Sequence, residues 1–334
     1  MTVTDETFNR ADIRPDWLMD RHQAAFARDL ARLAKQKHGF VVVPCPACGS
    51  AKSQRAFVSM EFPFVTCLSC ETLYMSPRPS PAAIAEYYAT SENVKFWAEH
   101  IYPTTTQRRR DGILAPRLRR LQNYYEHNNA RRDLIVEVGL GFGSFSQMAL
   151  DARLFDKAMT LGPGPELAGA CNSMFERSIQ DKDGIPMADA VVSFDLLERV
   201  FQPEALLTAI SRILSPGGLL ALSCTNALGF DILTLGATSP AIDGEHLNLF
   251  NPNSLTTLLG RCGFEVAEIE TPGNLDVDIV RDAALKGELD LTGQRLLKQI
   301  LIDDWERCGR PFQDFLSQNR LSSHMWCVAR RIAA

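Results

Sequence analysis

The 334-residue sequence has no apolar run of membrane-spanning length and no excess of positive charge. A spanning helix needs about 20 consecutive apolar residues, so we expect no membrane insertion. The first twenty residues, MTVTDETFNRADIRPDWLMD, are too acidic and polar for a secretory signal peptide. With 35 Lys and Arg against 40 Asp and Glu, the net charge is −5. That balance disfavours nucleic acid as a partner, because neutralising a phosphate backbone requires concentrated cations.

The sequence also lacks the even cysteine count of a disulfide framework, since its nine cysteines cannot all pair. Two C-x₂-C pairs, with eighteen residues between them, are formed by Cys45, Cys48, Cys67 and Cys70. Two such pairs can surround one ion tetrahedrally, and four thiolates leave no open position. We therefore expect a zinc ribbon with a structural Zn²⁺ in a reducing cytoplasm. The cysteines that we expect in the core are Cys171, Cys224, Cys262, Cys308 and Cys327.

Composition divides the chain into five segments without internal repeats. Residues 1–40 carry apolar positions at helical spacing, and residues 41–75 form the Cys-rich ribbon. Residues 76–130 begin with the proline-rich linker SPRPSP and continue as helices. Residues 131–270 alternate strand and helix patterns and are expected to form the core domain. Residues 271–334 are expected to hold a helical insertion and a final strand.

Strand and helix patterns alternate after Asp133. The runs LIVEV (134–138), AVVSFD (190–195) and LLALSC (219–224) are continuous apolar stretches, typical of buried parallel strands. Between the last two, PEALLTAISRIL has apolar residues on one helical face and Pro203 in its first turn. Repeated β-α-β units predict an α/β fold, an open and mostly parallel Rossmann-like sheet with helices on both faces.

A glycine-rich turn, EVGLGFG from Glu137 to Gly143, follows the first of these strands and opens a helix. Glycines let the backbone turn sharply and approach a ligand, and the helix start offers free N–H groups. Alone this spacing is a weak signal, because the glycines can serve only tight strand–helix packing. The turn does, however, follow the carboxyl end of a strand, which is where α/β sheets bind ligands.

The order and spacing of these motifs resemble the class I S-adenosylmethionine-dependent methyltransferases. SFDLLERV, PEALL and LSPGGLLAL look like the family's fourth strand, the following helix and the fifth strand, and the likeness runs from about Asp133 to Glu270. The resemblance implies S-adenosylmethionine as the cofactor. The residues that it places around the cofactor are Glu137, Gly139, Leu140, Gly141, Phe142, Gly143, Gly162, Asp195 and Leu196.

Two positions depart from the family pattern. Related enzymes end the second strand with Asp or Glu, which binds both ribose hydroxyls, whereas Gly162 stands here in LGPGPEL. Losing that charge-assisted pair weakens binding by about 2–3 kcal/mol, or roughly 30- to 150-fold, unless water or Glu166 compensates. Arg199 replaces the His that many relatives carry after the acid. We favour a working enzyme, and a non-catalytic scaffold that kept the fold is the alternative.

A ribbon placed before such a core resembles bacterial methyltransferases of sugar and surface-glycan biosynthesis, which include sugar C-methyltransferases. The resemblance implies a nucleotide-linked sugar or glycan precursor as substrate, methylated on oxygen or carbon. It also implies Glu245 and His246 as catalytic residues, with His246 taking a proton and an adjacent carboxylate raising its basicity. The sugar-family tyrosine two residues before that Glu is Asp243 here. The alternative for His246 is a structural role, in which it caps the following helix or hydrogen-bonds to the backbone. The alternative for the substrate is RNA.

Three further features have both a structural and a functional interpretation. The arginine run from Arg108 to Arg120 is typical of a solvated helix face, but guanidinium groups also clamp phosphates. His324 fits hydrogen bonding behind the last strand better than it fits a base. The aromatic residues that fit either a stacking wall for the substrate or packing between ribbon and core are Tyr87, Tyr88, Phe96 and Trp97.

Overall fold

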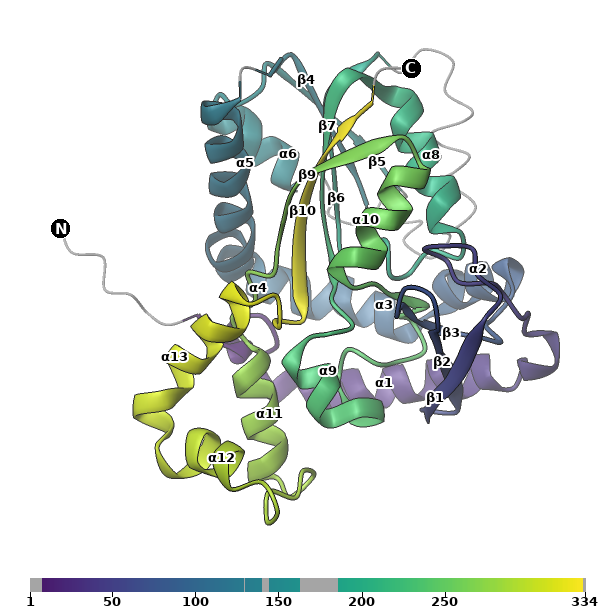
Figure 1. Ribbon diagram of the computed structural model, residues 1–334, viewed down its shortest axis with the longest axis vertical. Coiled ribbons are helices and arrows are strands. Elements are labelled where there is room, and N and C mark those ends of the chain that lie inside the picture. Colours follow the sequence, from purple (N-terminus) through teal and green to yellow (C-terminus); the bar gives the residue numbers. More distant parts are fainter. Residues whose placement is uncertain (1–7, 129, 140–143, 163–185, 333–334) are drawn as a thin grey trace.

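A six-stranded, mostly parallel sheet forms the centre of the molecule (Figure 1). The computed structural model describes residues 8–128, 130–139, 144–162 and 186–332. The strand order is β5-β4-β6-β7-β10-β9. Their bounds are β4 Leu134–Val138, β5 Lys157–Leu161, β6 Ala188–Phe194, β7 Leu214–Thr225, β9 Phe264–Glu270 and β10 His324–Arg331. The first four are parallel neighbours, and β10 runs antiparallel between β7 and β9. The α/β prediction is confirmed.

Alternate residues of the central strands enter two separate cores, one on each face of the sheet. Val136 and Leu220 pack in one cluster with the apolar faces of α8 (Pro203–Ile213) and α10 (Pro252–Arg261). Ile135 and Ala221 enter the other cluster, with α5 (Ala115–His127) and α6 (Ser144–Asp151). Successive side chains of a strand point to opposite faces, so strands buried on both faces must be apolar at every position. This explains the unbroken apolar runs in the sequence.

The ends of two core elements differ from the sequence-based expectation. Helix α8 ends at Ile213 and has Pro203 in its first turn, as predicted. The strand that follows begins at Leu214 rather than Leu219, and it includes the Ser-Pro-Gly-Gly stretch. Gly217 has a φ of +75°, a left-handed conformation that disfavours any side chain.

Three of the predicted core cysteines, Cys224, Cys262 and Cys327, are buried. Cys308 is only half-buried, and Cys171 lies outside the described residues.

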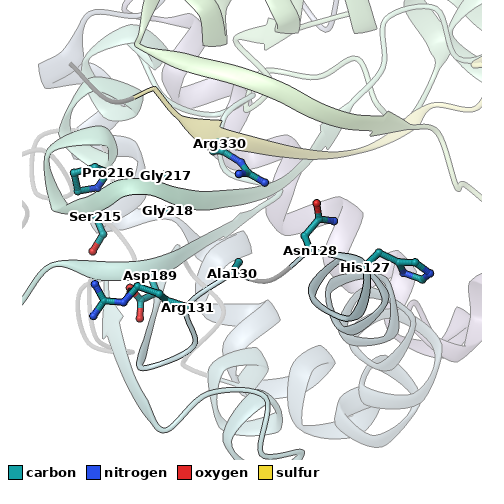
Figure 2. A pocket seen from close by; sticks show the side chains of 10 residues that line it. All are labelled: His127, Asn128, Ala130, Arg131, Asp189, Ser215, Pro216, Gly217, Gly218 and Arg330. Carbon is teal, nitrogen blue, oxygen red and sulfur yellow. Dashed lines mark ion pairs between the residues drawn. The ribbon is translucent and has the colours of Figure 1, made fainter.

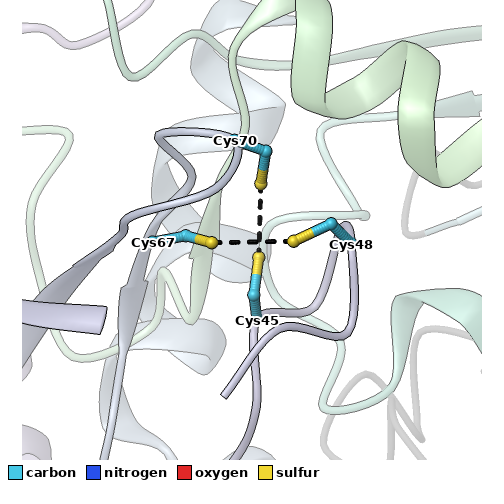
Figure 3. Close-up of side chains that lie close together, drawn as sticks. All are labelled: Cys45, Cys48, Cys67 and Cys70. Carbon is cyan, nitrogen blue, oxygen red and sulfur yellow. Dashed lines mark hydrogen bonds between the residues drawn. The ribbon is translucent and has the colours of Figure 1, made fainter. Parts of the chain in front are cut away.

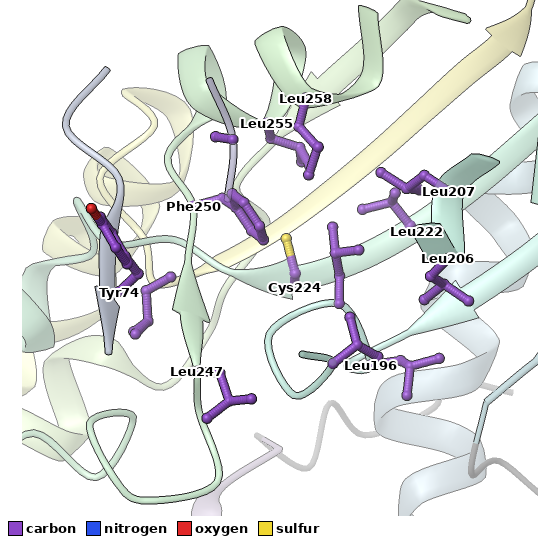
Figure 4. Close-up of a cluster of buried hydrophobic side chains, with 14 of the residues drawn as sticks. Tyr74, Leu196, Leu206, Leu207, Leu222, Cys224, Leu247, Phe250, Leu255 and Leu258 are labelled. Atoms are coloured by element: carbon purple, nitrogen blue, oxygen red, sulfur yellow. The ribbon is translucent and has the colours of Figure 1, made fainter. Parts of the chain in front are cut away.

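The segment before the sheet consists of helices around a small antiparallel sheet. Its strands are β1 (Ser53–Ser59), β2 (Phe62–Cys67) and β3 (Leu73–Met75), and β3 also pairs with β8 (Asn248–Leu249). Figure 4 shows Tyr74 of β3 in the same buried cluster as Phe250, Leu247 and Leu222 of the main domain. The helices here are η1 Arg10–Asp12, α1 Asp16–Ala34, η2 Lys37–Gly39, α2 Pro81–Thr90, α3 Glu92–Phe96, η3 Trp97–Ile101, α4 Tyr102–Arg109 and η4 Arg110–Leu114. The Cys-rich segment therefore shares one continuous core with the sheet.

A helical layer stands between β9 and β10, where the sequence predicted an insertion. It comprises α11 Asp276–Leu285, α12 Arg295–Lys298, η7 Gln299–Asp303 and α13 Trp305–Gln318. It has its own apolar cluster around Val277, Val280 and Leu301, joined by Phe230 of α9 (Phe230–Leu235, followed by η6 Gly236–Thr238). In Figure 1 this layer and α1 both lie at the lower end of the sheet. Within the part of the chain that the structure describes, no helix has the length and apolar character of a membrane span.

Candidate functional site

The four paired cysteines converge on one point, as Figure 3 shows. Their sulfur atoms all lie within 4.8 Å of one another. The Sγ of Cys45 lies 3.5 Å from that of Cys70, and the Sγ of Cys48 lies 3.6 Å from that of Cys67. A tetrahedral zinc–thiolate centre with bonds of about 2.3 Å has sulfur–sulfur edges of about 3.8 Å. The donor set and its spacing therefore fit a closed four-thiolate metal centre.

The two cysteine pairs lie on matching backbone turns. The N–H of Gly49 donates to the carbonyl of Cys45 (2.9 Å), and the N–H of Glu71 donates to the carbonyl of Cys67 (3.0 Å). The residue after each pair is left-handed, with φ of +75° at Gly49 and +59° at Glu71. Glu71 therefore places a side chain where glycine is preferred.

Replacing this residue, Glu71→Gly, is expected to stabilise the protein by about 1 kcal/mol. A non-glycine residue in a left-handed conformation costs about 1–3 kcal/mol, and the greater freedom of glycine in the unfolded chain cancels part of the gain. The midpoint of denaturant unfolding measures the change. Lys52→Gly is the control, because Lys52 lies in the same module without a positive φ. Equal stability changes in the two variants would contradict this role for the left-handed backbone.

Hydrogen bonds join the Cys-rich module to the segment that carries Glu245 and His246. The side-chain amide of Asn251 donates to the carbonyl of Cys70 (3.0 Å). The N–H of Met75 donates to the carbonyl of Leu247 (3.0 Å), and Leu73 pairs with Leu249. The position of His246 therefore depends on the order of the Cys-rich module.

Glu137 and Gly139 stand at the carboxyl end of β4. The carboxylate of Glu137 is buried and accepts a hydrogen bond from the backbone N–H of Ser146 (2.9 Å), in the first turn of α6. Burial raises the pKa of Glu137, and the hydrogen bonds from Ser146 oppose this shift. Gly139 has a φ of +154°, and a Cβ there would meet no atom within 4 Å. Leu140, Gly141, Phe142 and Gly143 lie outside the described residues.

Gly162 follows the last residue of β5 and neighbours the glycine turn. Val138 pairs with Leu161, and the N–H of Gly139 donates to the carbonyl of Leu161 (3.2 Å). Gly162 therefore lies at the carboxyl edge of the sheet beside Gly139. Glu166, which the sequence offered as a substitute acid, lies outside the described residues.

Asp195 and Leu196 follow β6 and differ sharply in what they can contact. Asp195 has a φ of +53°, a strained conformation for a non-glycine residue. Its carboxylate is half-exposed and accepts hydrogen bonds from Ser223 Oγ and Arg117 Nη2, each 2.8 Å away. Partial desolvation by the surrounding protein opposes ionisation, but the charge of Arg117 holds the pKa of Asp195 well below its usual range. The side chain of Leu196 is buried in the core, so only its backbone is available to a cofactor.

Arg117 and His324 complete this cluster, and the sequence did not assign either of them to it. His324 pairs with Thr225 at the start of β10, and its Nε2 lies 3.4 Å from Arg117 Nη2. Burial lowers the pKa of His324 to about 4. The negative charge of Asp195 opposes this shift, and the positive charge of Arg117 adds to it. The imidazole is therefore neutral at physiological pH. One signal was present: Arg117 lies one helical turn before Leu121, on the buried side of α5.

Asp243, rather than Glu245, is the carboxylate that holds His246. Its Oδ1 lies 2.8 Å from His246 Nδ1 and also accepts the backbone N–H of His246 (3.0 Å). Burial alone would raise the pKa of Asp243, but His246 and then Arg199 lower it to about 2. Because the acceptor is an ionised carboxylate, Nδ1 carries the imidazole proton. The alternative that His246 caps the next helix is wrong, since Asn251 caps α10.

Glu245 is engaged elsewhere, with three partners from distant parts of the chain. Tyr87 Oη donates to Oε1 (2.6 Å), Asn93 Nδ2 donates to the same oxygen (3.3 Å), and Arg199 forms an ion pair with Oε2. Arg199 Nη2 also lies 3.3 Å from His246 Nε2. The departure at Arg199 is therefore tied to Glu245. The ion pair with Glu245 places the guanidinium of Arg199 against Nε2 of His246, the imidazole nitrogen that does not face Asp243.

Glu198 is a buried acid with an unsatisfied oxygen. Thr225 Oγ1 donates weakly to Oε1 (3.4 Å), while Oε2 has no partner among the described residues. Burial, and then the charge of Asp195, raise the pKa of Glu198. The loop after β6 thus holds two acids, Asp195 and Glu198, with opposite pKa shifts.

The arginine run is divided between surface and interior. Arg108 pairs with Asp12 (3.5 Å) and Arg110 pairs with Asp151 (3.7 Å), both near the surface. Arg120 pairs with Glu270. Arg109 and Arg117 face inward, so the interpretation of the run as a solvated face holds only for part of it.

A surface cavity lies at the opposite, amino-terminal end of the parallel strands (Figure 2). It is lined by residues from the end of α5 and the loop before β4, by residues at the starts of β6 and β7, and by Arg330 near the end of β10. Ligands of open α/β sheets bind outside the carboxyl ends of the strands. The candidate active site is therefore the charged cluster at the other end.

Residues 106–269 match the profile of a family described as a methyltransferase domain. A search of curated proteins found no match. The chain is similar in structure to the 1,6-didemethyltoxoflavin-N1-methyltransferase of Burkholderia thailandensis (13% identity, 84% of this chain and 100% of that chain, TM-score 0.43). It is also similar to a SAM-dependent methyltransferase from Archaeoglobus fulgidus (15% identity, 66% of this chain and 94% of that chain, TM-score 0.42). A third similar structure is the [4+2]-cyclase SpnF (13% identity, 65% of this chain and 81% of that chain, TM-score 0.37).

At such identities and TM-scores the structural matches carry no argument about activity, whereas the domain match does. It spans β4 through most of β9, including the glycine turn and the acids that follow β6. The match shows that residues 106–269, which carry most of this sheet, form a methyltransferase domain of the class I S-adenosylmethionine-dependent kind.

Proposed function

We propose that the protein transfers a methyl group from S-adenosylmethionine to an oxygen or carbon of an activated sugar or surface-glycan precursor. The sequence resemblance and the charged cluster at the carboxyl edge of the sheet support this function. The observation that carries it is the Asp243–His246 pair, a positioned imidazole on the loop between η6 and β8. An acceptor hydroxyl or acidic carbon needs such a group to take its proton as the methyl arrives.

Glu137, Gly139 and Asp195 fit the methionine end of the cofactor. Glu137 secures the start of α6, Gly139 permits close backbone approach, and Asp195 presents an ionised carboxylate. Residues 140–143 and the backbone at Gly162 and Leu196 complete the proposed site. When bound, S-adenosylmethionine supplies an electrophilic sulfonium methyl group. Catalysis then rests mainly on holding the acceptor in line with it.

His246 is proposed as the group that receives the acceptor's proton. With its proton on Nδ1 and bonded to Asp243, the imidazole presents the lone pair of Nε2. Arg199 occupies that nitrogen, so the acceptor must take the place of the guanidinium there. Glu245, also expected to be catalytic, is proposed as a positioning residue. Its carboxylate forms an ion pair with Arg199, and Arg199 in turn contacts the imidazole of His246.

The four cysteines are proposed to hold a structural Zn²⁺. Their spacing matches the ion, and a site closed by four thiolates has no position for substrate. Free thiolates of this kind persist in a reducing compartment, which supports a cytoplasmic location.

Transfer of labelled methyl groups to a panel of nucleotide sugars tests the proposed acceptor. We expect label in at least one sugar nucleotide and none in RNA. Label that enters RNA while every sugar nucleotide stays unlabelled would show that the acceptor class is wrong.

His246→Ala is expected to lower kcat by about 100-fold or more while the Kd for S-adenosylmethionine changes less than threefold. General-base assistance is commonly worth about 100- to 10,000-fold in rate, and His246 contacts no described residue of the glycine turn. Single-turnover kinetics and calorimetric titration measure the two quantities. Asn128→Ala serves as the control, since this residue lies at the other end of the sheet. An unchanged kcat would remove His246 from the mechanism.

A further inference from the structure

We propose that Arg14 and Arg109 form a binding site for an anionic group, a phosphate or diphosphate, carried by the methyl acceptor. The identity of the anion's carrier rests on the proposed function. The anion site itself rests on the contacts of the two arginines.

Both arginines are held against the same indole ring. The guanidinium carbon of Arg14 lies 5.7 Å from the centre of the Trp97 ring, and that of Arg109 lies 5.1 Å from it. Arg109 also lies 5.0 Å from the centre of the Tyr102 ring. Its other contacts are neutral: Nε donates to Thr105 Oγ1 (2.9 Å), and Nη2 donates to the carbonyl of Ile13 (2.7 Å). The ring thus gathers two like charges in a partly buried place.

Neither arginine forms an ion pair among the described residues, whereas the neighbouring Arg10, Arg108 and Arg110 each do. Burial, and then the charges of Arg10 and Arg109, lower the pKa of Arg14 to about 10. Burial likewise lowers the pKa of Arg109. Buried charges in proteins are normally paired, because an unpaired one is costly to desolvate. Two partly buried arginines over the same ring, neither with an ion-pair partner among the described residues, therefore favour a ligand of opposite charge.

The acids whose charges reach this pair already have other partners. The charge of Asp243 raises the pKa of Arg14, but the carboxylate of Asp243 is hydrogen-bonded to His246. The charge of Asp195 likewise raises the pKa of Arg109, but the carboxylate of Asp195 is hydrogen-bonded to Arg117 and Ser223. These same acids stand at the proposed transfer site. An anion bound between Arg14 and Arg109 would therefore lie within electrostatic reach of Asp195 and Asp243.

The anion's chemistry follows from the donors. Two planar guanidinium groups offer paired N–H donors that match the oxygens of a phosphate. Arg14 lies in the turn between η1 and α1 and Arg109 lies in α4. Both belong to the helical layer at the carboxyl edge of the sheet and not to the glycine turn. Such a site would anchor the acceptor by a handle remote from the atom that is methylated.

Inorganic pyrophosphate is the probe, titrated into the full-length protein without cofactor at constant ionic strength. We expect Arg14→Gln and Arg109→Gln each to weaken binding about tenfold or more, since charge-assisted hydrogen bonds are worth at least this factor. Arg110→Gln, a neighbour on the surface, should stay within twofold. Arg14 makes no side-chain hydrogen bond among the described residues, so its variant is expected to fold normally. Pyrophosphate should also raise the Tm of the wild type and of Arg110→Gln, but not that of the double variant.

The outcomes separate this site from the proposed function. Absence of pyrophosphate binding to the wild type, or equal binding to the double variant, would overturn the anion site. Loss of pyrophosphate binding in the variants, with no sugar nucleotide ever methylated, would keep the anion site and refute the sugar acceptor. Methylation of a sugar nucleotide with an unchanged KM in the double variant would refute the anion site alone.

Discussion

Cys67→Ser is expected to remove the bound metal and to loosen the whole Cys-rich module. Cys67 supplies one of the four converging sulfurs, and a serine oxygen is a poor replacement for a thiolate on zinc. Changes to outer-shell partners alone cost about 10- to 100-fold in metal affinity, so loss of a direct ligand should cost at least about 100-fold. Metal analysis after dialysis should fall from one ion per chain to almost none.

Activity should fall with the metal, although no substrate reaches the cysteines. Strand β3 continues the chain from the second cysteine pair, and it pairs with β8 just after His246. The N–H of Met75 also fixes the carbonyl of Leu247. Loss of order in the module therefore releases the loop that positions Asp243 and His246. We expect a lower Tm and a lower kcat in the same preparation.

Cys308→Ser is the matched control, because Cys308 lies on α13 outside the quartet and is only half-buried. It should keep full metal content, Tm and turnover. A Cys67→Ser protein that retained one tightly bound ion per chain would refute the zinc ribbon. Retained turnover after complete metal loss would refute only the coupling to β8.

The sheet was predictable because its strands are buried on both faces. An unbroken apolar run such as Leu134–Val138, placed directly before a glycine turn, is typical of a central parallel strand. The cysteine spacing was equally local, since each turn closes within five residues. The module's packing was not predictable, because β3–β8 pairing joins segments more than 170 residues apart and leaves no periodic signal.

The partners of the candidate catalytic residues were also hidden from the sequence. Adjacency in the chain favoured Glu245 as the partner of His246, whereas the fold supplies Asp243, three residues before it. The loop between them turns so that Glu245 points to Arg199 and Tyr87 instead. Pairs of this kind depend on where a loop turns, which residue type alone does not specify.

Gly162→Asp is expected to tighten the binding of S-adenosylmethionine by about 30- to 150-fold. Gly162 stands at the carboxyl edge of the sheet, one residue after the Leu161–Val138 pair. A carboxylate there can accept hydrogen bonds from both ribose hydroxyls, and this is worth about 2–3 kcal/mol.

Calorimetric titration of S-adenosylmethionine and its demethylated product into both proteins measures the effect. Gly162→Asn should gain less than Gly162→Asp, because a neutral amide lacks the charge-assisted bond. Thr160→Asp is the control for added charge, since it places a carboxylate on an exposed position of β5 two residues before the edge. An equal gain from Thr160→Asp would mean that general attraction of the sulfonium cation, and not the ribose, accounts for the change. No gain from Gly162→Asp, together with tight binding by the wild type, would mean that another group already holds the ribose.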